Sequence, residues 1–220
     1  MSGKLIVIEG IDGSGKATQS RLLVDYFISN GKMCKGITFP RYGNPSASLV
    51  ELYLGGGLGD NPDDVSPYAA SLFYSVDRYC SYKQDWGEFY NSGGIVVADR
   101  YTTSNAVHQS SKLSYSDRDV YLSWLFSLEY DILKLPKPDL VIYLDVPLSV
   151  SKSLMLLRDE QTNTKSDIHE KNLDYLDRCK EVSKYLIDKY GWKKVNCSYN
   201  GYIRPVDEIH NHIVNLLGDF

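Results

Sequence analysis

The chain has 220 residues, of which 43% are hydrophobic and 24% charged, a composition typical of a globular protein with one sizeable core. Its net charge of −4 argues against broad binding to nucleic acid, because no excess of lysine and arginine is available to displace counterions from phosphates. The cysteines show no C-x-x-C or metal-ligand spacing, so we expect reduced thiols in a cytoplasmic protein; they are Cys34, Cys80, Cys179 and Cys197.

Strand-like and helix-like segments alternate along the chain. The first apolar run is too short for a signal peptide or a membrane span and is typical of a strand buried on both faces. In chain order, the predicted elements are strand Lys4–Glu9, helix Ala17–Asn30, strand Met33–Phe39, a helix from Pro67 to about Tyr90, strand Ile95–Ala98, strand Leu140–Leu144, helices Pro147–Leu157 and Asp167–Tyr190, strand Lys194–Cys197 and helix Val206–Leu217. This order predicts an α/β fold: a doubly wound parallel sheet of about five strands, with helices on both faces and ligands at the carboxyl ends of the strands.

A glycine-rich stretch, GIDGSGKAT at residues 10–18, joins the first predicted strand to the first predicted helix. It nearly matches the phosphate-binding motif G-x-x-x-x-G-K-[ST], except that Ala17 replaces the hydroxyl residue and Thr18 follows one position late. The glycines allow backbone amides to face an anion, Lys16 adds a mobile charge, and the helix adds its positive end. We therefore predict a phosphate-binding loop over residues 10–18.

Asp12 is unusual in such a loop, because a carboxylate inside an anion cradle would repel phosphate. Its side chain should therefore meet a ligand hydroxyl, a magnesium-bound water or a neighbouring arginine, unless it only stabilises the turn. Acidic residues also end three predicted strands, at Glu9, Asp99 and Asp145, where buried carboxylates need partners or cations.

Three arginines lie beside predicted strand ends or on the helix that follows the second strand. Arg41 follows the second strand, Arg100 follows Asp99 at the end of the third, and Arg78 shares a helix face with Tyr74. Each could be a structural or surface residue by itself. Their joint placement near a phosphate loop indicates a site for a second phosphate.

These motifs resemble the thymidylate kinases, within the P-loop nucleoside monophosphate kinases. The resemblance covers nearly the whole chain and rests on the segments IEGIDGSGKATQ, FPRYG, YAASLFYSVDR, ADRYTTSNAVHQ, PDLVIYLDVP, DIHEKNLDYLDR and RPVDEI. It implies a single domain over residues 1–220 with a P-loop NTPase-type sheet and a small lid at about residues 158–166. It also implies transfer of a phosphoryl group from ATP, with Mg²⁺, to dTMP in dTTP synthesis. The expected protein is a cytoplasmic homodimer that binds no nucleic acid and no membrane.

The resemblance also implies roles for individual residues. ATP would be bound by Gly10, Gly13, Ser14, Gly15, Lys16, Ala17 and Thr18. In dTMP, Asp12 would bind the 3′-hydroxyl, and Arg41 and Arg100 would bind the phosphate. Tyr74, supported by Phe73, would stack on the thymine ring, and Arg78 and Asn105 would bind the edge of the base. Phe39, Ser104 and His108 would line the same site. The catalytic set would be Lys16, Asp99, Arg100 and Arg158, the last entering from the lid. Asp99, directly or through water, and Glu170 in a D-x-x-E pattern with Asp167 would hold the metal.

The chain departs from the family pattern at several positions. Gly13 stands where some members carry an arginine, so we expect Arg158, rather than Lys165, to supply most of the lid charge. Ala17 removes a hydroxyl ligand for Mg²⁺, and we expect a water ordered by Asp99 and Thr18 in its place. His108 stands where the family often has tyrosine, which predicts greater tolerance of ribonucleotide acceptors, although a histidine that only packs in its helix is equally consistent with the sequence.

Two other functions stay open at this point: a kinase for another (deoxy)nucleoside monophosphate or for a deoxynucleoside, and a nucleotide-binding switch without transfer activity. A neutral nucleoside would not need a second arginine clamp, and a switch would not need a second nucleotide pocket. His169, His210 and His212 show no metal-ligand arrangement and are expected to be surface or hydrogen-bonded histidines.

Overall fold

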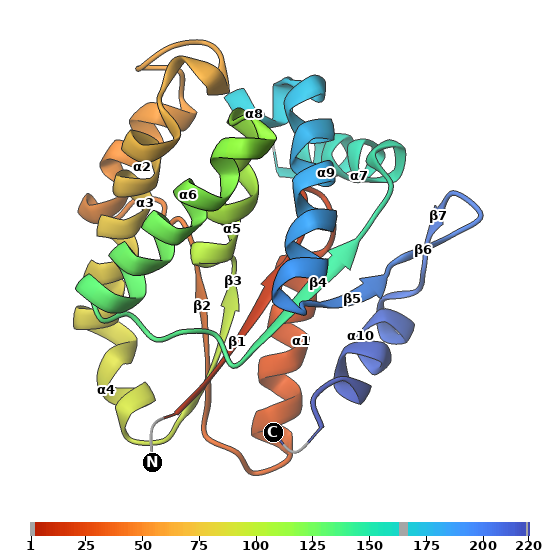
Figure 1. The fold of residues 1–220 in the computed structure, drawn as a ribbon. Helices are drawn as coiled ribbons and strands as arrows, with labels where there is room; N and C mark the ends of the chain where they lie inside the picture. The colour runs from red at the N-terminus through yellow and green to blue at the C-terminus, as the bar shows by residue number, and fades with distance from the viewer. Residues whose placement is uncertain (1–2, 163–166, 219) are drawn as a thin grey trace.

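A parallel sheet of five strands forms the centre of the described chain (Figure 1). The computed structural model describes residues 3–162, 167–218 and 220, with side chains except at 157–162 and 171. The strand order is β2 (Cys34–Thr38), β3 (Ile95–Asp99), β1 (Lys4–Glu9), β4 (Leu140–Asp145) and β5 (Lys193–Asn196), and every adjacent pair is parallel. The predicted fold class and its five strands are confirmed.

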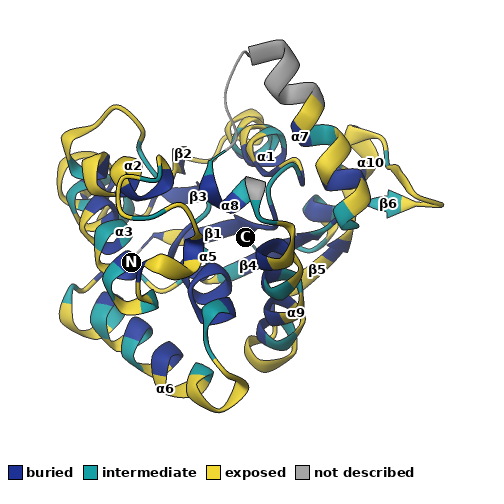
Figure 2. Ribbon diagram, turned by 90° about the horizontal axis from the view of Figure 1, so that it is seen from above, coloured by how far each residue is buried: buried dark blue, intermediate teal, exposed yellow. Residues whose placement is uncertain are grey.

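Helices cover both faces of this sheet. Successive apolar residues of each strand point to opposite faces, so they contribute in turn to two hydrophobic cores. Their bounds are α1 Lys16–Ser29, α2 Ser48–Leu54, α3 Pro67–Ser81, α4 Gly87–Asn91, α5 Thr102–His108, α6 Tyr115–Phe126, α7 Leu148–Thr162, α8 Ile168–Lys171, α9 Leu173–Tyr190 and α10 Val206–Asn215. Along β1, Leu5 and Val7 face the core under α5, α6 and α9, whereas Ile6 and Ile8 face the core under α1 and α10. Figure 2 shows the strands buried between these helices, which expose their outer faces.

Several helices differ in extent from the predicted segments. The helix expected up to about Tyr90 changes to a π-helical turn at Tyr82–Trp86, and α4 completes it. The segment expected as one helix over Asp167–Tyr190 breaks at Asn172, whose side chain accepts a hydrogen bond from Tyr175 N and caps α9. α7 continues to Thr162, so the first part of the expected lid is helical, and residues 163–166 lie outside the described structure.

Some elements had no predicted counterpart. They are α2, α5, α6 and a hairpin of β6 (Ser198–Tyr199) and β7 (Tyr202–Ile203). α5 escapes a search for apolar periodicity because its buried residues include Thr102, Thr103 and Asn105. Polar side chains occupy its inner face because that face lines a polar pocket.

The carboxyl ends of the strands lie at one edge, where polar groups are concentrated. Asp145 at the end of β4 is paired with Lys180 at 3.7 Å and Lys194 at 3.6 Å, as the rule for strand-end carboxylates requires. Within residues 3–162, 167–218 and 220, no helix is long and apolar enough to cross a membrane.

Candidate active site

Two pockets meet at the carboxyl edge of the sheet in the described part of the chain. The loop pocket is lined by residues 12–19, Thr38, Phe39, Pro40, Arg41, Tyr42, Asn44, Asp99, Arg100, Leu154, Asp167, Glu170, Ile203, Arg204, Val206 and Ile209. The inner pocket is lined by Asp12, Phe39, Pro40, Tyr42, Leu54, Tyr74, Arg78, Arg100, Tyr101, Ser104, Asn105, His108, Gln109, Asp167 and His169. The pockets share six residues, so ligands in the two pockets would meet at Asp12, Phe39, Pro40, Tyr42, Arg100 and Asp167.

The phosphate loop has the backbone geometry that an anion cradle needs. Gly13 and Gly15 have φ angles of 72° and 88°, a region that favours glycine. A Cβ at Gly13 would lie 2.6 Å from Ser151 O, so any larger residue would displace the loop from α7. The buried Ser14 Oγ has no hydrogen-bond partner among the described residues, as expected of a group that awaits a ligand.

Lys16 lies in the same loop with its ammonium group directed back at the loop. Its Nζ donates to Ile11 O at 2.8 Å and lies 3.9 Å from Asp12 Oδ1. Burial and the charge of Arg100 lower the pKa of Lys16, while Asp12 and Asp99 partly restore it. A bound anion would replace the lost hydration of this ammonium group.

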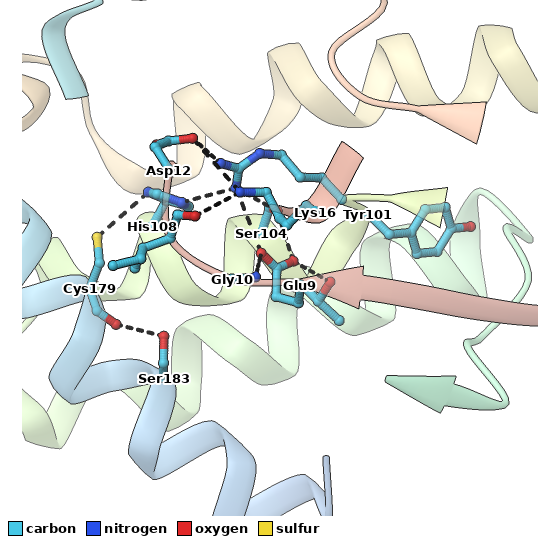
Figure 3. Close-up of polar contacts among 12 residues, drawn as sticks. Glu9, Gly10, Asp12, Lys16, Tyr101, Ser104, His108, Cys179 and Ser183 are labelled. Carbon is cyan, nitrogen blue, oxygen red and sulfur yellow. Dashed lines mark hydrogen bonds and ion pairs between the residues drawn. The ribbon is translucent and has the colours of Figure 1, made fainter. Parts of the chain in front are cut away.

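Arg100 joins the two pockets through its contacts with four side chains, Asp12, Ser104, His108 and Glu9, which Figure 3 shows gathered around one point. Its backbone φ is 67°, and its guanidinium donates to Asp12 Oδ1, to Ser104 Oγ at 3.3 Å and to His108 Nε2 at 3.3 Å. It also lies 3.6 Å from Glu9 Oε1. Burial by itself would raise the pKa of the Asp12 carboxyl, but Arg100 and Lys16 outweigh it and hold that pKa below its usual range. Asp12 therefore meets an arginine, one of the partners expected from the sequence.

The buried carboxylate of Glu9 links the glycine-rich loop to α5 through hydrogen bonds. It accepts hydrogen bonds from Gly10 N at 3.0 Å, Thr103 Oγ1 at 2.8 Å and Ser104 Oγ at 2.8 Å. These bonds link the start of the phosphate loop to α5. The loop that carries Asp12 is thus held against α5, which begins two residues after Arg100.

The floor of the inner pocket is a buried ion pair between Arg78 and Glu129. Arg78 Nε donates to Glu129 Oε2 at 2.8 Å, and a second nitrogen of Arg78 bonds both Glu129 Oε1 and Asn105 Oδ1. Both charged side chains are almost fully buried, at 1% and 0% exposure. Burial lowers the pKa of Arg78, but the charge of Glu129 outweighs this effect and raises it. Arg78 is therefore fixed and charged.

The side-chain amides of Asn105, on α5, and of Gln109, at the C-terminal end of α5, line the inner pocket. Asn105 Nδ2 is buried and lacks a partner in the described part of the molecule; the buried Gln109 amide makes no hydrogen bond of good geometry there, although it lies close enough to the Tyr53 hydroxyl to oppose the rise in the pKa of that group. Buried amides without partners are costly, so a ligand that pairs with them would bind favourably. Tyr74 lines the same pocket from α3.

Arg41 lines the loop pocket and is held by an acidic partner. Its Nε donates to Asp77 Oδ1 at 3.0 Å and its backbone N to Asp77 Oδ2 at 2.9 Å, while Nη2 donates to Ser46 Oγ at 2.6 Å. Asp77 is 1% exposed and lies on α3 next to Arg78. One helix therefore orients both arginines.

The acidic residues expected near a metal line the loop pocket. Asp99 ends β3 there, and Asp167 and Glu170 approach from the segment around α8. Burial and the neighbouring Asp12 raise the pKa of Asp167 to about 6. Among the described residues, no group of three or more His, Cys, Asp or Glu could hold a metal by itself. The side chains of Arg158 on α7 and of Lys165 lie outside the described residues.

The sequence predicted no role in this site for several residues that line or support it: Tyr42, Asp77, Gln109, Glu129 and His169. Gln109 could have been found from its spacing, because it follows Asn105 by one helical turn. Glu129 could not, because it follows no motif and meets Arg78 only through the folded chain.

Comparisons with known proteins agree on one family. A family model described as thymidylate kinase matches residues 8–213. A thymidylate kinase of Plasmodium falciparum (isolate 3D7) is 27% identical, over 96% of this chain and 88% of that protein. A probable thymidylate kinase of Thermococcus onnurineus is 30% identical, over 96% of each chain. The solved structure of a thymidylate kinase from Candida albicans has a similar fold, with a TM-score of 0.70, 22% identity and coverage of 97% of this chain and 90% of that one.

Glu129→Ala should lower the free energy of unfolding by about 3–5 kcal/mol, because it leaves the Arg78 guanidinium buried without a counter-charge. Urea denaturation would measure this. Asp131→Ala is the matched control, since Asp131 pairs with Lys137 at 3.6 Å with both side chains more than 60% exposed. The control should change stability by less than about 1 kcal/mol. Equal effects of the two substitutions would contradict the prediction.

Asp167→Asn should become progressively more stable than the wild type as pH rises. Burial and the nearby Asp12 raise the pKa of Asp167 to about 6 in the folded protein, whereas in the unfolded chain it has its ordinary value of 3.8. Between these values the unfolded chain loses its proton first, so wild-type stability falls as pH rises. Urea denaturation from about pH 4 to about pH 7 should show the difference between the proteins growing and then levelling off above the folded pKa. A constant difference would show that Asp167 is not the titrating group.

Proposed function

Since the chain belongs to the thymidylate kinase family and phosphorylates dTMP, we propose that it takes the phosphoryl group from ATP bound in the loop pocket and transfers it to dTMP bound in the inner pocket. The observation that carries this proposal is the junction of the two pockets at Asp12 and Arg100. Phosphoryl transfer needs two polyanions in line and cations where their charges meet. Arg100 supplies a cation at that junction.

ATP fits the loop pocket by its phosphates. The positive-φ glycines turn the loop amides inward, Lys16 has a desolvated ammonium group, and Ser14 Oγ lacks a partner in the described chain. The start of α1 adds the positive end of a helix. These groups are all donors or cations, which suits a triphosphate.

The donor set around the loop also suits Mg²⁺. This ion commonly keeps several waters and binds one or two carboxylates together with phosphate oxygens, so it needs no cage of protein ligands. Asp99 and Glu170 line the loop pocket and would hold the ion, with Thr18 nearby and Ala17 leaving room for water. When bound, the ion neutralises part of the negative charge of the phosphates.

The acceptor phosphate would be bound by Arg100, with Arg41 reaching in from the loop pocket. Both guanidiniums are oriented by carboxylates, Asp12 for Arg100 and Asp77 for Arg41. Asp12 remains ionised because of Arg100 and Lys16, and its carboxylate would accept a hydrogen bond from the 3′-hydroxyl of the sugar. A phosphate monoester is largely dianionic near neutral pH, so it attacks without a dedicated base. Arg158, whose side chain lies outside the described residues, keeps its expected role of steadying the transferring group, and a lid that excludes water would suppress hydrolysis of ATP.

The thymine ring would stack on Tyr74 and be read by the amides of α5. Thymine offers one N–H donor and two carbonyl acceptors. Asn105 Oδ1 is already occupied by Arg78, so Asn105 Nδ2 is left to donate, while the Gln109 amide can both donate and accept. Arg78, locked by Glu129, would face the remaining carbonyl. This set of donors and acceptors can satisfy the N–H and both carbonyls of thymine or uracil.

A homodimer is supported by the inverted polarity of α3. Its buried residues are mostly polar or charged, and include Ser75, Asp77 and Arg78, because this side builds the site. Its apolar side chains are exposed instead; they are Tyr68 at 38%, Leu72 at 45%, Val76 at 49% and Tyr79 at 39%. A second copy with the same stripe would cover this face in a symmetric contact.

An acceptor panel tests the proposed activity. With ATP and Mg²⁺, dTMP should stimulate ADP formation most, compared with ribothymidine monophosphate, dUMP, UMP and dGMP. Gln109→Ala should lower kcat/KM for dTMP about tenfold, the effect of one hydrogen bond to a buried partner. Asn91→Ala, an exposed amide at the end of α4, is the control and should leave the activity unchanged. ADP formation independent of any acceptor would instead indicate a nucleotide switch.

Replacing Leu72 and Val76 together by glutamate should convert a dimer into a monomer of 24.9 kDa, because charge on both partners would face itself across the symmetry axis. Sedimentation would measure the mass. Ile28→Glu, at a 55% exposed apolar position on α1, should leave the dimer intact. A wild-type protein that sediments as a monomer would contradict the proposal.

A further inference from the structure

The short helix α8 carries two acidic residues to the active site but has little structure of its own. It has four residues, Ile168–Lys171, between the Asp167 cap and Asn172. A single helical turn is not stable alone, because its few internal hydrogen bonds do not offset the entropy of ordering it. Side-chain contacts must therefore hold it in position.

Ile168 and His169 provide these contacts. Ile168 is 6% exposed and packs in an apolar cluster with Val50, Leu54 and other residues of α2 and its surroundings. His169 is 5% exposed, and its Nε2 lies 2.8 Å from the Tyr53 hydroxyl. An apolar side chain gives packing without direction, whereas a hydrogen-bonded imidazole also fixes orientation.

The His169 ring stacks on the ring of His108, with centroids 5.5 Å apart and an interplanar angle of 12°. His108 Nε2 must accept from Arg100, because a guanidinium can only donate, so the proton of His108 lies on Nδ1, 3.5 Å from Cys179 Sγ. Burial and Arg100 lower the pKa of His108 to about 3, and burial and His108 lower that of His169 well below its usual value. Two neutral rings can stack without charge repulsion.

Tyr53 continues the contacts on the other side of His169. Its hydroxyl accepts from Lys112 Nζ at 2.9 Å, donates to Pro62 O at 3.3 Å and is hydrogen-bonded to His169 Nε2 at 2.8 Å. A connected set of contacts thus runs from Lys112 through Tyr53, His169 and His108 to Arg100.

We propose that His169 is a positioning residue, which fixes the acidic turn Asp167–Glu170 against the wall of the inner pocket that binds the acceptor. Asp167 Oδ1 accepts from His169 N at 2.8 Å and from Glu170 N at 2.9 Å, so the carboxylates move with the turn that carries His169. Asp167 lines both pockets and Glu170 lines the loop pocket. The inference rests on the proposed placement of dTMP in the inner pocket.

Because of its position, loss of His169 should affect binding of the acceptor more than binding of ATP. His169 lines the inner pocket and reaches Arg100 through His108, but the phosphate loop holds its geometry through Glu9, Ile11 and its glycines. Loss of His169 should therefore weaken acceptor binding and slow turnover, with much less effect on ATP. A merely structural role would lower the amount of folded enzyme and leave both KM values unchanged.

A double-mutant cycle tests this inference. His169→Phe keeps a ring for stacking and removes Nε2, and Tyr53→Phe keeps the ring and removes the hydroxyl. Each should raise KM for dTMP about three- to tenfold, the range of one neutral hydrogen bond, and leave KM for ATP within about twofold. If both act through the same bond, the double variant should resemble either single one rather than their product. His212→Ala, on α10, is the control and should match the wild type.

Hydrogen exchange supplies a second readout that does not depend on turnover. In the wild type, dTMP should increase protection of residues 167–172, and the His169 variants should lose most of this increase. Multiplicative effects in the cycle, an equal rise of both KM values, or unchanged protection would overturn the inference. Wild-type activity with dTMP tests the proposed function separately, because the inference is read only from ratios of variant to wild type.

Discussion

The site depends on a partly buried arginine that is shared between two pockets. Arg100 follows β3 in a left-handed backbone conformation and meets Asp12, Glu9, Ser104 and His108. Removing a guanidinium from water is costly unless carboxylates compensate it, and Asp12 and Glu9 do so from the phosphate loop and the strand before it. This pairing joins β1, β3 and α5 and sets the spacing between the loop pocket and the inner pocket.

The same physical requirement shapes α3. A helix on the surface of a globular protein normally buries its apolar side. In α3 the buried side holds Asp77 and Arg78, which orient Arg41 and meet Glu129, so the apolar stripe faces outward. Building a polar site inside the molecule therefore creates an exposed apolar surface outside it. The proposed dimer follows from that consequence, and the two features are produced by one helix.

A second polar set lies behind the inner pocket. His108 and His169 are neutral because they are buried, and they stack between Arg100 on one side and Tyr53 on the other. This arrangement connects the segment after residue 166 to the inner pocket through directional contacts. Apolar packing alone would hold the segment near the pockets but would not orient Asp167 toward the inner pocket and Glu170 toward the loop pocket.

Local patterns in the sequence determined the sheet, the phosphate loop and the family. Buried parallel strands read as short apolar runs, and the loop needs glycine and lysine at given spacings, so both are visible in neighbouring residues. The motifs also brought Asp12, Arg78 and Arg100 into consideration, and an arginine was among the partners expected for Asp12. Only the tertiary structure decided that Arg78 meets Glu129, that Arg41 meets Asp77 and that His169 stacks on His108. Such pairs join distant segments, and the energy that selects them comes from burial and charge compensation, which no local pattern encodes.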